Sequence, residues 1–290
     1  MDVHPNILII GPSQAGKTSV GRILADYYHT SCANTGDLIA DAMLRDGLTP
    51  RKRTEAQREE MFSYAAQRKA EQPDFFARLG LDTTHIVTGT RTAVEFAAAR
   101  AGFDLTIWVS RPGHNGNTTD RLRTEMADIV IHNDRGLVEL EDEVITRIPA
   151  FLELPEFYVV GRYRHYLTDG SYDLGAMARM AADELRVGRI VRECGLRAFC
   201  PANTFHPLDG VWDGEQIVEV CLEKLGRMRP RDGICIRDGW AETDYLSASE
   251  GATDEIEYAT ELGLQVTYDK HGEAVLREAL LRVLQTGAVA

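Results

Sequence analysis

The chain has 290 residues, of which 44% are hydrophobic and 27% are charged. This balance is typical of a soluble globular protein, and the length is sufficient for two domains, each with its own core. The formal net charge of −13 disfavours a broad nucleic-acid-binding surface and favours small substrates, and no apolar run is long enough to span a membrane.

The cysteines and the amino terminus indicate the cell compartment. The five cysteines are odd in number and form neither a CxxC pair nor a cluster with zinc-ligand spacing, so we expect reduced thiols. The apolar run near the amino terminus is too short for a signal peptide and leads into a glycine-rich loop. We therefore expect a cytoplasmic protein.

Apolar runs alternate with helical patterns along the whole chain, which predicts an α/β fold with parallel sheets. In the first half, strands are expected near residues 6–10, 30–33, 84–89, 105–110 and 128–132, and helices at 17–28, 37–47, 54–71, 92–102 and 136–149. In the second half, strands are expected at 157–161, 197–200, 232–237 and 264–268, and helices at 172–194, 214–226, 252–263 and 272–285. Because a new strand begins just after Leu154-Pro155, we expect two domains, 1–153 and 154–290.

A phosphate-binding loop follows the first expected strand. Residues 11–18 read GPSQAGKT and match the pattern GxxxxGK[ST], between the strand NILII and the helix TSVGRILADYY. The backbone N–H groups of such a loop surround phosphates, and the helix N-terminus adds positive potential. Lys17 is expected to bridge the β- and γ-phosphates of ATP, and Thr18 to coordinate Mg²⁺. The expected contacts to ATP come from Gly11, Ser13, Ala15, Gly16, Lys17, Thr18 and Ser19.

Two further segments resemble the acceptor side of P-loop nucleotide kinases. The segment NTGD, residues 34–37, resembles the TGD segment that opens the acceptor-site helix of adenylate kinases, although Thr35 or Asp37 would also suit a helix cap. The segment GTRT, residues 89–92, follows an expected strand. It resembles the segment of adenylate kinases and phage deoxynucleotide kinases in which an arginine holds the phosphate of the acceptor. The resemblance implies that the acceptor is bound by Thr35, Gly36 and Arg91.

Later segments of the first half extend this resemblance. The polar stretch that contains Arg111, Arg121 and Arg123 lies where nucleotide kinases have a lid, and Arg121 and Arg123 are expected to act on the transferring phosphoryl group. A solvated loop is the alternative interpretation. The segment ADIVIHNDRG, residues 127–136, resembles a strand and turn of dephospho-coenzyme A kinase and phage deoxynucleotide kinases. That likeness implies that Asn133 lies near the base of ATP.

The chemical group of the acceptor stays open at this point. In adenylate kinases the TGD helix continues to an arginine that grips the acceptor phosphate, and here Ala40 occupies that place. Asp37 is also positioned as in dephospho-coenzyme A kinase, where an aspartate could accept a hydroxyl proton. A phosphate acceptor needs no base, whereas a hydroxyl acceptor benefits from one.

The second half carries a different set of motifs, YVVGRYR at 158–164, RDGICI at 231–236 and SEGATDEIEYA at 249–259. In this order they resemble the nucleoside 2-deoxyribosyltransferase superfamily, which includes deoxynucleotide N-glycoside hydrolases. The resemblance implies that Glu255 is the nucleophile that attacks the anomeric carbon, that Asp232 is a second acid, and that Ser249 binds a 5′-phosphate. A first-turn glutamate favoured by the helix dipole is the alternative for Glu255. The other implied substrate contacts are Gly161, Arg162, Tyr163, Arg164 and Gly251.

These resemblances imply a P-loop kinase-type parallel sheet followed by a flavodoxin-like or Rossmann-like parallel sheet. The leading hypothesis is an ATP-dependent phosphotransferase that acts on a nucleotide or nucleotide-like acceptor, fused to a deoxynucleotide-binding domain whose expected chemistry is cleavage or exchange of the N-glycosidic bond. The alternatives are a kinase of a modified base in DNA, with the second domain as a recognition module, and a non-catalytic nucleotide sensor. Small nucleotides are the expected partners, DNA is disfavoured, and the second resemblance implies a homo-oligomer formed through the second domain.

Overall fold

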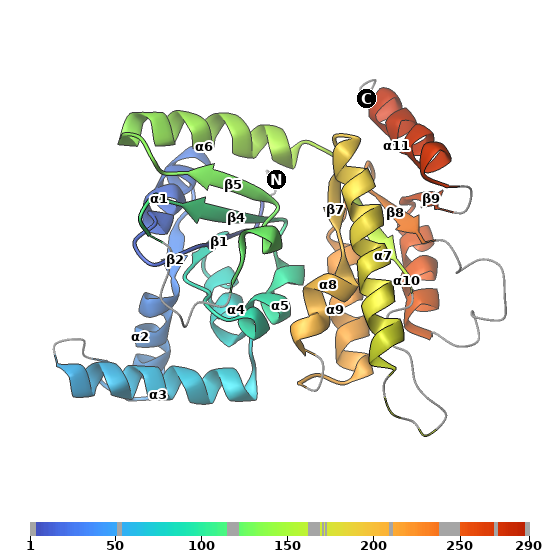
Figure 1. The fold of residues 1–290 in the computed structure, drawn as a ribbon. Coiled ribbons are helices and arrows are strands. Elements are labelled where there is room, and N and C mark those ends of the chain that lie inside the picture. The colour runs from blue at the N-terminus through green and yellow to red at the C-terminus, as the bar shows by residue number, and fades with distance from the viewer. Residues whose placement is uncertain are drawn as a thin grey trace. The chain divides into compact units, whose positions relative to one another are not determined.

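The computed structural model describes residues 4–50, 54–114, 122–161, 169, 171, 173–208, 211–237, 250–269 and 272–287 (Figure 1). The chain divides into two compact units, Met1–Leu152 and Glu153–Ala290. Among the described residues, no helix has both the length and the apolar character needed to cross a bilayer.

The first unit is built on a parallel sheet of five strands in the order β2-β3-β1-β4-β5. These strands are β1 (Ile7–Ile10), β2 (Cys32–Asn34), β3 (Ile86–Thr88), β4 (Leu105–Ser110) and β5 (Ile129–His132). The helices are α1 (Lys17–Tyr27), α2 (Thr35–Arg45), α3 (Glu55–Glu71), α4 (Phe75–Leu81), α5 (Ala93–Ala99) and α6 (Leu137–Leu152), with short 3₁₀ helices at Arg100–Gly102 and Thr124–Met126.

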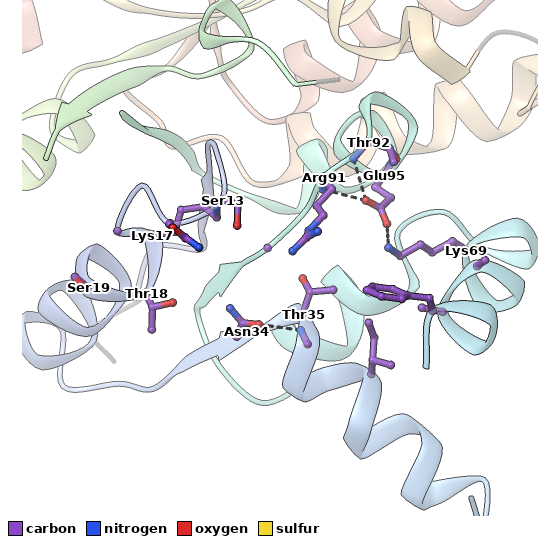
Figure 2. Close-up of a pocket in the computed structure, with 18 of the residues that line it drawn as sticks. Ser13, Lys17, Thr18, Ser19, Asn34, Thr35, Lys69, Arg91, Thr92 and Glu95 are labelled. Atoms are coloured by element: carbon purple, nitrogen blue, oxygen red, sulfur yellow. Dashed lines mark hydrogen bonds and ion pairs between the residues drawn. The ribbon is translucent and has the colours of Figure 1, made fainter. Parts of the chain in front are cut away.

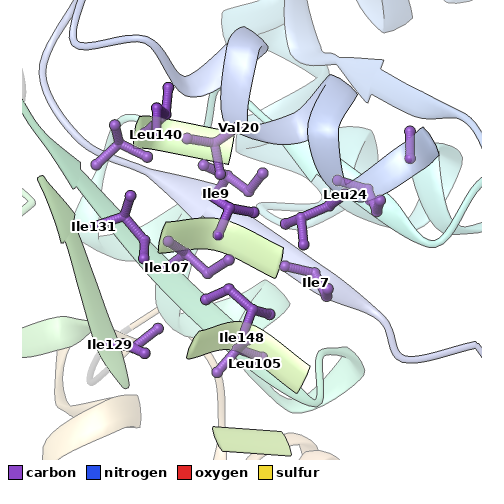
Figure 3. Packing of buried hydrophobic residues seen from close by; sticks show 14 of the residues in the cluster. Ile7, Ile9, Val20, Leu24, Leu105, Ile107, Ile129, Ile131, Leu140 and Ile148 are labelled. Atoms are coloured by element: carbon purple, nitrogen blue, oxygen red, sulfur yellow. The ribbon is translucent and has the colours of Figure 1, made fainter. Parts of the chain in front are cut away.

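The central strand β1 is fully buried on both faces. Because side chains alternate along a strand, Ile7 and Ile9 pack with α1 and α6 on one face, as Figure 3 shows, while Leu8 and Ile10 pack on the other face. Helices on both faces therefore fix the strand that leads into the phosphate-binding loop, which is how parallel sheets are normally covered.

Helix α4 is absent from the predicted elements. It has only seven residues, too few to show a helical period in the sequence. Tertiary packing stabilises it, because Phe76 and Leu79 are buried and a Cβ on Gly80 would lie 2.8 Å from a methyl group of Val87 on β3.

The second unit contains a parallel sheet of four strands in the order β7-β6-β8-β9. Its strands are β6 (Glu156–Val160), β7 (Arg197–Phe199), β8 (Gly233–Ile236) and β9 (Gln265–Tyr268), and its helices are α7 (Leu174–Glu193), α8 (Pro201–Phe205), α9 (Gly214–Gly226), α10 (Glu250–Glu261) and α11 (Glu273–Gly287), with a 3₁₀ helix at His206–Leu208. Numbered within the unit, the order is 2-1-3-4, as in the first four strands of flavodoxin-like sheets. The predicted α/β class with two parallel sheets is confirmed.

Helix α8 is the other helix that the sequence patterns missed. Its first backbone N–H groups are bound by a carboxylate from another helix: Glu184 on α7 accepts from the N–H of Ala202 at 3.0 Å and of Asn203 at 2.9 Å. A carboxylate at a helix N-terminus satisfies N–H groups that lack partners within the helix. This cap is non-local, and the helix has only five residues, too few to show a helical period, so the proline at its start is the one local signal in its sequence.

Candidate functional site

The phosphate-binding loop connects β1 to α1 as the sequence predicts. Gly11 and Gly16 adopt φ angles of 135° and 103°, which favour glycine. A Cβ on Gly11 would lie 2.4 Å from the carbonyl oxygen of Val109 on β4, and one on Gly16 would lie 2.2 Å from Nδ2 of Asn133. Both glycines are therefore required by the backbone conformation and by close packing.

Asn133 supports this loop directly. It follows β5, and its Nδ2 donates a hydrogen bond of 2.8 Å to the carbonyl oxygen of Ala15, while its backbone N–H donates to the oxygen of Ser110 at 2.8 Å. The turn after β5 is thus tied to the loop. Whether Asn133 also contacts the base of ATP stays a prediction.

Lys17 lies over its own loop. Its Nζ donates to the carbonyl oxygens of Gly11 at 2.7 Å and Pro12 at 2.6 Å. The ammonium group is therefore held at the mouth of the loop, where a P-loop lysine meets phosphate oxygens.

A cavity of about 910 Å³ opens beside the loop (Figure 2). One wall is the loop and the start of α1, and the opposite walls come from the start of α2, one face of α3 and the segment after β3. The residues that line the cavity are Ser13, Gln14, Gly16, Lys17, Thr18, Ser19, Asn34, Thr35, Gly36, Ile39, Phe62, Ala65, Ala66, Lys69, Gly89, Arg91, Thr92, Glu95 and Arg111. The structure thus brings five of the seven residues predicted to contact ATP, all but Gly11 and Ala15, to one cavity with the predicted acceptor residues Thr35, Gly36 and Arg91.

The start of α2 is fixed against the end of β3. Thr35 Oγ1 donates to the carbonyl oxygen of Thr88 at 2.9 Å, and Asn34 Nδ2 donates to Thr88 Oγ1 at 3.0 Å. The helix cap is Asn34, whose Oδ1 accepts from the N–H of Gly36 at 2.9 Å, so the interpretation of Thr35 or Asp37 as the cap is wrong. Gly89 has a φ of 106° and packs against Thr35, which a Cβ would approach to 2.9 Å.

Arg91 is positioned by a buried carboxylate. Glu95, 7% exposed, accepts through Oε2 from the backbone N–H groups of Arg91 at 3.0 Å and Thr92 at 3.1 Å. Its Oε1 forms an ion pair with Lys69 of α3. Figure 2 shows the Arg91 side chain extending from this loop into the space between the phosphate loop and α2. The pattern Thr92-x-x-Glu95 is a capping box that could have been found in the sequence, whereas Lys69 had no local signal.

The remaining predicted residues of the first unit lie in different surroundings. Arg111 lines the cavity, but Arg123 is exposed and does not line it. Asp37, in the first turn of α2, is likewise exposed and outside the cavity lining. Arg121 lies outside the described residues.

Glu255 is a buried carboxyl group of the second unit with a raised pKa. It lies on α10, is 8% exposed, and its carboxyl group is beside the Tyr158 hydroxyl of β6 and the Cys221 thiol of α9. Burial raises the pKa of Glu255 to about 7, and the negative charge of Glu184 adds to this rise, while Cys221, Tyr158 and Arg237 oppose it. A strongly perturbed buried acid is a candidate for chemistry.

Asp232 is held elsewhere, at the amino end of β8. Its Oδ1 accepts from the N–H of Glu156 at 2.8 Å, and its Oδ2 accepts from the N–H of Arg229 at 2.7 Å. Ligands of open parallel sheets bind at the carboxyl ends of the strands. Asp232 therefore binds backbone N–H groups at the amino end of the strand and shares no partner with Glu255 among those described. Its catalytic role stays a prediction.

Two predicted glycines of the second unit are sites of close packing. A Cβ on Gly161 would lie 2.2 Å from Nε of Arg237, and one on Gly251 would lie 2.7 Å from a methyl group of Val218 on α9. Arg237, 3% exposed at the end of β8, also donates to the carbonyl oxygen of Met180 at 2.6 Å; the sequence patterns did not single it out. Four further predicted substrate contacts lie outside the described residues: Arg162, Tyr163, Arg164 and Ser249.

Among the described residues, no group of histidine, cysteine, aspartate and glutamate side chains could hold a metal ion. Mg²⁺ is often held by one or two protein groups together with substrate phosphates. The hydroxyl of Thr18, which lines the cavity beside Lys17, suits that mode of binding.

The buried carboxyl group of Glu255 makes the second unit sensitive to pH. Because its folded-state pKa is raised from 4.5 to about 7, the folded state keeps a proton that the unfolded state releases. We expect the free energy of unfolding to fall as pH rises from about 5 to about 7.5, by on the order of 2–3 kcal/mol. Burial also raises the pKa of Glu184, so Glu184 lowers the free energy of unfolding in the same pH range. Comparing the Glu255→Gln variant with the unmodified chain by urea denaturation over this range therefore isolates the contribution of Glu255. If the free energy of unfolding fell with pH as steeply in Glu255→Gln as in the unmodified chain, the raised pKa of Glu255 would be contradicted.

No model of a known protein family matches the chain, and no curated protein matches it. Among solved structures, it is similar to an unliganded sugar kinase from Janibacter sp. HTCC2649, with 15% sequence identity and a TM-score of 0.30, over 51% of this chain and 95% of that one. It is also similar to a shikimate kinase from Aquifex aeolicus vf5, with 16% identity and a TM-score of 0.31, over 50% of this chain and 96% of that one. These likenesses are distant, so the function is inferred below from the cavity.

Proposed function

We propose that the first unit is an ATP-dependent phosphotransferase that acts on a nucleotide or nucleotide-like acceptor. One observation carries the proposal: Lys17 of the phosphate loop and Arg91 of the opposite wall line the same cavity of about 910 Å³. A loop that only anchored a nucleotide would need no second cationic wall facing it.

The residues of the cavity divide into two functions. The backbone of the loop and Lys17 bind the β- and γ-phosphates of ATP, because N–H groups at a helix N-terminus and an ammonium group favour anions. Arg91 and Lys69 on the opposite side bind and orient the acceptor, which brings its attacking atom toward the γ-phosphorus. Thr18 would hold Mg²⁺ together with the nucleotide, and the metal would supply charge neutralisation of the phosphate oxygens. Arg111 at the cavity adds a further positive charge.

The proposal is tested by incubating the chain with ATP and a panel of nucleosides, nucleotides and DNA oligonucleotides with modified bases, followed by product masses. We expect one small nucleotide-like compound to gain a single phosphoryl group. A gain on DNA only would favour a DNA-base kinase, and ATP binding without any transfer would favour a nucleotide sensor.

A second candidate activity belongs to the second unit, which we propose binds a deoxynucleotide and cleaves or exchanges its N-glycosidic bond. The supporting observation is the buried carboxyl group of Glu255, whose pKa is raised to about 7 between Tyr158 and Cys221. Retaining cleavage of a glycosidic bond uses a carboxylate as nucleophile and a carboxyl group as acid. We also propose that the chain forms a homo-oligomer through this unit. Analytical ultracentrifugation of the full-length chain measures its oligomeric state.

We expect the full-length chain to release free base from a deoxynucleoside 5′-monophosphate, detected by chromatography. Glu255→Gln should lower this release by at least about a hundredfold, because the neutral amide is neither nucleophile nor acid. Binding of deoxynucleotides with no release would leave the second unit as a binding module, and no binding at all would reject the proposed site.

A further inference from the structure

We propose that Cys221 of α9 is a positioning residue for Glu255: its thiol donates a hydrogen bond to the Glu255 carboxylate and holds that group ready to act as a nucleophile. This role rests on the N-glycosidic activity proposed for the second unit, and it identifies how the charge of the same site is controlled. None of the sequence motifs includes Cys221, and no step of the chemistry proposed above uses it.

Close packing of α9 against α10 places the thiol and the carboxyl group together. A Cβ on Gly251 would lie 2.7 Å from a methyl group of Val218, and one on Gly226 would lie 3.1 Å from the hydroxyl oxygen of Tyr258. The residues on the facing sides of the two helices, spaced at i, i+3 and i+8 and at i, i+4 and i+7, are Val218, Cys221 and Gly226 on α9 and Gly251, Glu255 and Tyr258 on α10. The pair therefore lies between two points at which the helices approach closely, where a side chain as short as cysteine reaches the carboxyl group.

The thiol is the better placed of two polar neighbours of this carboxyl group. Cys221 and Tyr158 are both buried beside Glu255. Tyr158 Oη meets none of the described residues at normal hydrogen-bond geometry, whereas the Cys221 side chain is hydrogen-bonded to Glu255. Because buried polar groups are normally hydrogen-bonded, the thiol is the neighbour that satisfies the carboxyl group.

The charges around Glu255 show what the thiol contributes. Burial raises the pKa of Glu255 to about 7, and the hydrogen bond from Cys221 is the largest effect that opposes this rise. Tyr158 of β6 and Arg237 of β8 oppose it less, and the negative charge of Glu184 on α7 adds to it. Without the thiol, the carboxyl group would therefore keep its proton to a higher pH.

Cys221 stays a donor over the range in which Glu255 titrates. Burial and then the negative charge of Glu255 raise the pKa of Cys221 well above its usual value, so the sulfur keeps its proton. A hydrogen bond to an ionised acceptor is stronger than one between neutral groups, so the thiol favours the carboxylate over the carboxylic acid. A carboxylate has two oxygens, and one that is held by the thiol leaves the other for the anomeric carbon.

The first test is the pH dependence of kcat/KM for base release from a deoxynucleoside 5′-monophosphate by the full-length chain, because this profile reports ionisation of the free enzyme. The unmodified chain should become active as pH rises through about 7, where Glu255 loses its proton. Cys221→Ala should move this midpoint up by about one pH unit and lower the rate at pH 7 by about fivefold. Cys221→Ser, whose hydroxyl also donates, should keep the midpoint at or below that of the unmodified chain.

The matched control is Cys235→Ala. Cys235 is a buried cysteine of β8 that packs with α7 and α11, in a different part of the core of the same unit. The substitution removes the same sulfur atom and creates a similar cavity, so it should lower stability without moving the pH midpoint. An equal shift in Cys235→Ala and Cys221→Ala would mean that loss of packing, and not loss of the donor, moves the profile.

The second test detects the hydrogen bond itself through the infrared S–H stretching band, which moves to lower frequency when a thiol donates. Subtracting the spectrum of Cys221→Ser isolates the band of Cys221 from those of the other four cysteines. We expect a lowered frequency above the pKa of Glu255 and an increase when Glu255 is protonated or replaced in Glu255→Gln, because a neutral group is the weaker acceptor.

The role of Cys221 and the proposed activity can fail separately. Base release with an unmoved midpoint in Cys221→Ala, together with an S–H band that does not respond to pH, would overturn the role of Cys221 and keep the N-glycosidic activity. A band that responds to pH, with no base released from any deoxynucleotide, would keep the bond between thiol and carboxylate and reject the N-glycosidic activity.

Discussion

Replacing Lys17 by alanine is expected to lower ATP-dependent phosphoryl transfer by at least about a thousandfold, the scale seen when a preorganised charge is removed from a transition state. The ammonium group of Lys17 lies over the phosphate loop, and Lys17 lines the cavity of the first unit. Without it, the negative charge that develops between the β- and γ-phosphates loses its nearest protein cation. The measurement is the initial rate of transfer with saturating ATP.

The fold should survive this substitution. Lys17 Nζ contributes two hydrogen bonds to carbonyl oxygens of a partly exposed loop, and water can replace them at a cost of about 1–2 kcal/mol. We therefore expect a cooperative thermal transition in Lys17→Ala and an unchanged rate in the surface control Arg45→Ala. A variant that folds and turns over ATP at the normal rate would refute the role of the loop in transfer.

Replacing Lys224 by methionine is expected to destabilise the second unit by about 3–5 kcal/mol, because it removes a cation from a buried carboxylate. Lys224 is 1% exposed and its Nζ donates to Oε2 of Glu156 at 2.7 Å. Glu156 is 4% exposed and keeps Arg197, whose Nη2 lies 3.3 Å from Oε1. The methionine fills a similar volume, so the expected loss reflects charge rather than a cavity.

Hydrogen exchange of peptides from β6 and β8 measures this effect within the second unit, even where the two units unfold separately. The control is Arg282→Ala, which removes an exposed ion pair. The side chain of Arg282 is 71% exposed and that of its partner Glu278 is 65% exposed. Exposed pairs contribute little, so exchange in this control should match the unmodified chain. Equal exchange in Lys224→Met would show that the buried ion pair does not stabilise the unit.

Local patterns in the sequence predicted the elements that are long or carry a complete motif. The strand before the phosphate loop and the helix after it are where the pattern GxxxxGK[ST] and the apolar run NILII place them. These features are encoded within a few residues by backbone conformation and by alternation of apolar side chains. Thr35 and Arg91, the predicted acceptor residues, were likewise singled out through short motifs, and the structure brings both to the cavity.

The features that were missed depend on contacts between distant parts of the chain. Helix α8 is capped by Glu184 from α7, and Lys69 reaches the cavity because Glu95 of another helix binds it. The carboxylate of Asp232 is bound to Arg229 and to the N–H of Glu156, and the motif did not indicate these partners; its catalytic role stays a prediction. A single sequence does not contain these pairings, because the fold must first bring the partners together.

The most direct test of the phosphotransferase uses ATP whose γ-phosphate carries heavy oxygen, together with the panel of nucleoside and nucleotide acceptors and Mg²⁺. We expect the labelled phosphoryl group to appear on the acceptor, with its three non-bridging oxygens intact in the mass of the phosphorylated product, and Lys17→Ala to abolish this product. Label that appears only in inorganic phosphate, with the acceptor unchanged across the whole panel, would mean that the cavity hydrolyses or merely binds ATP and would contradict the proposed transfer.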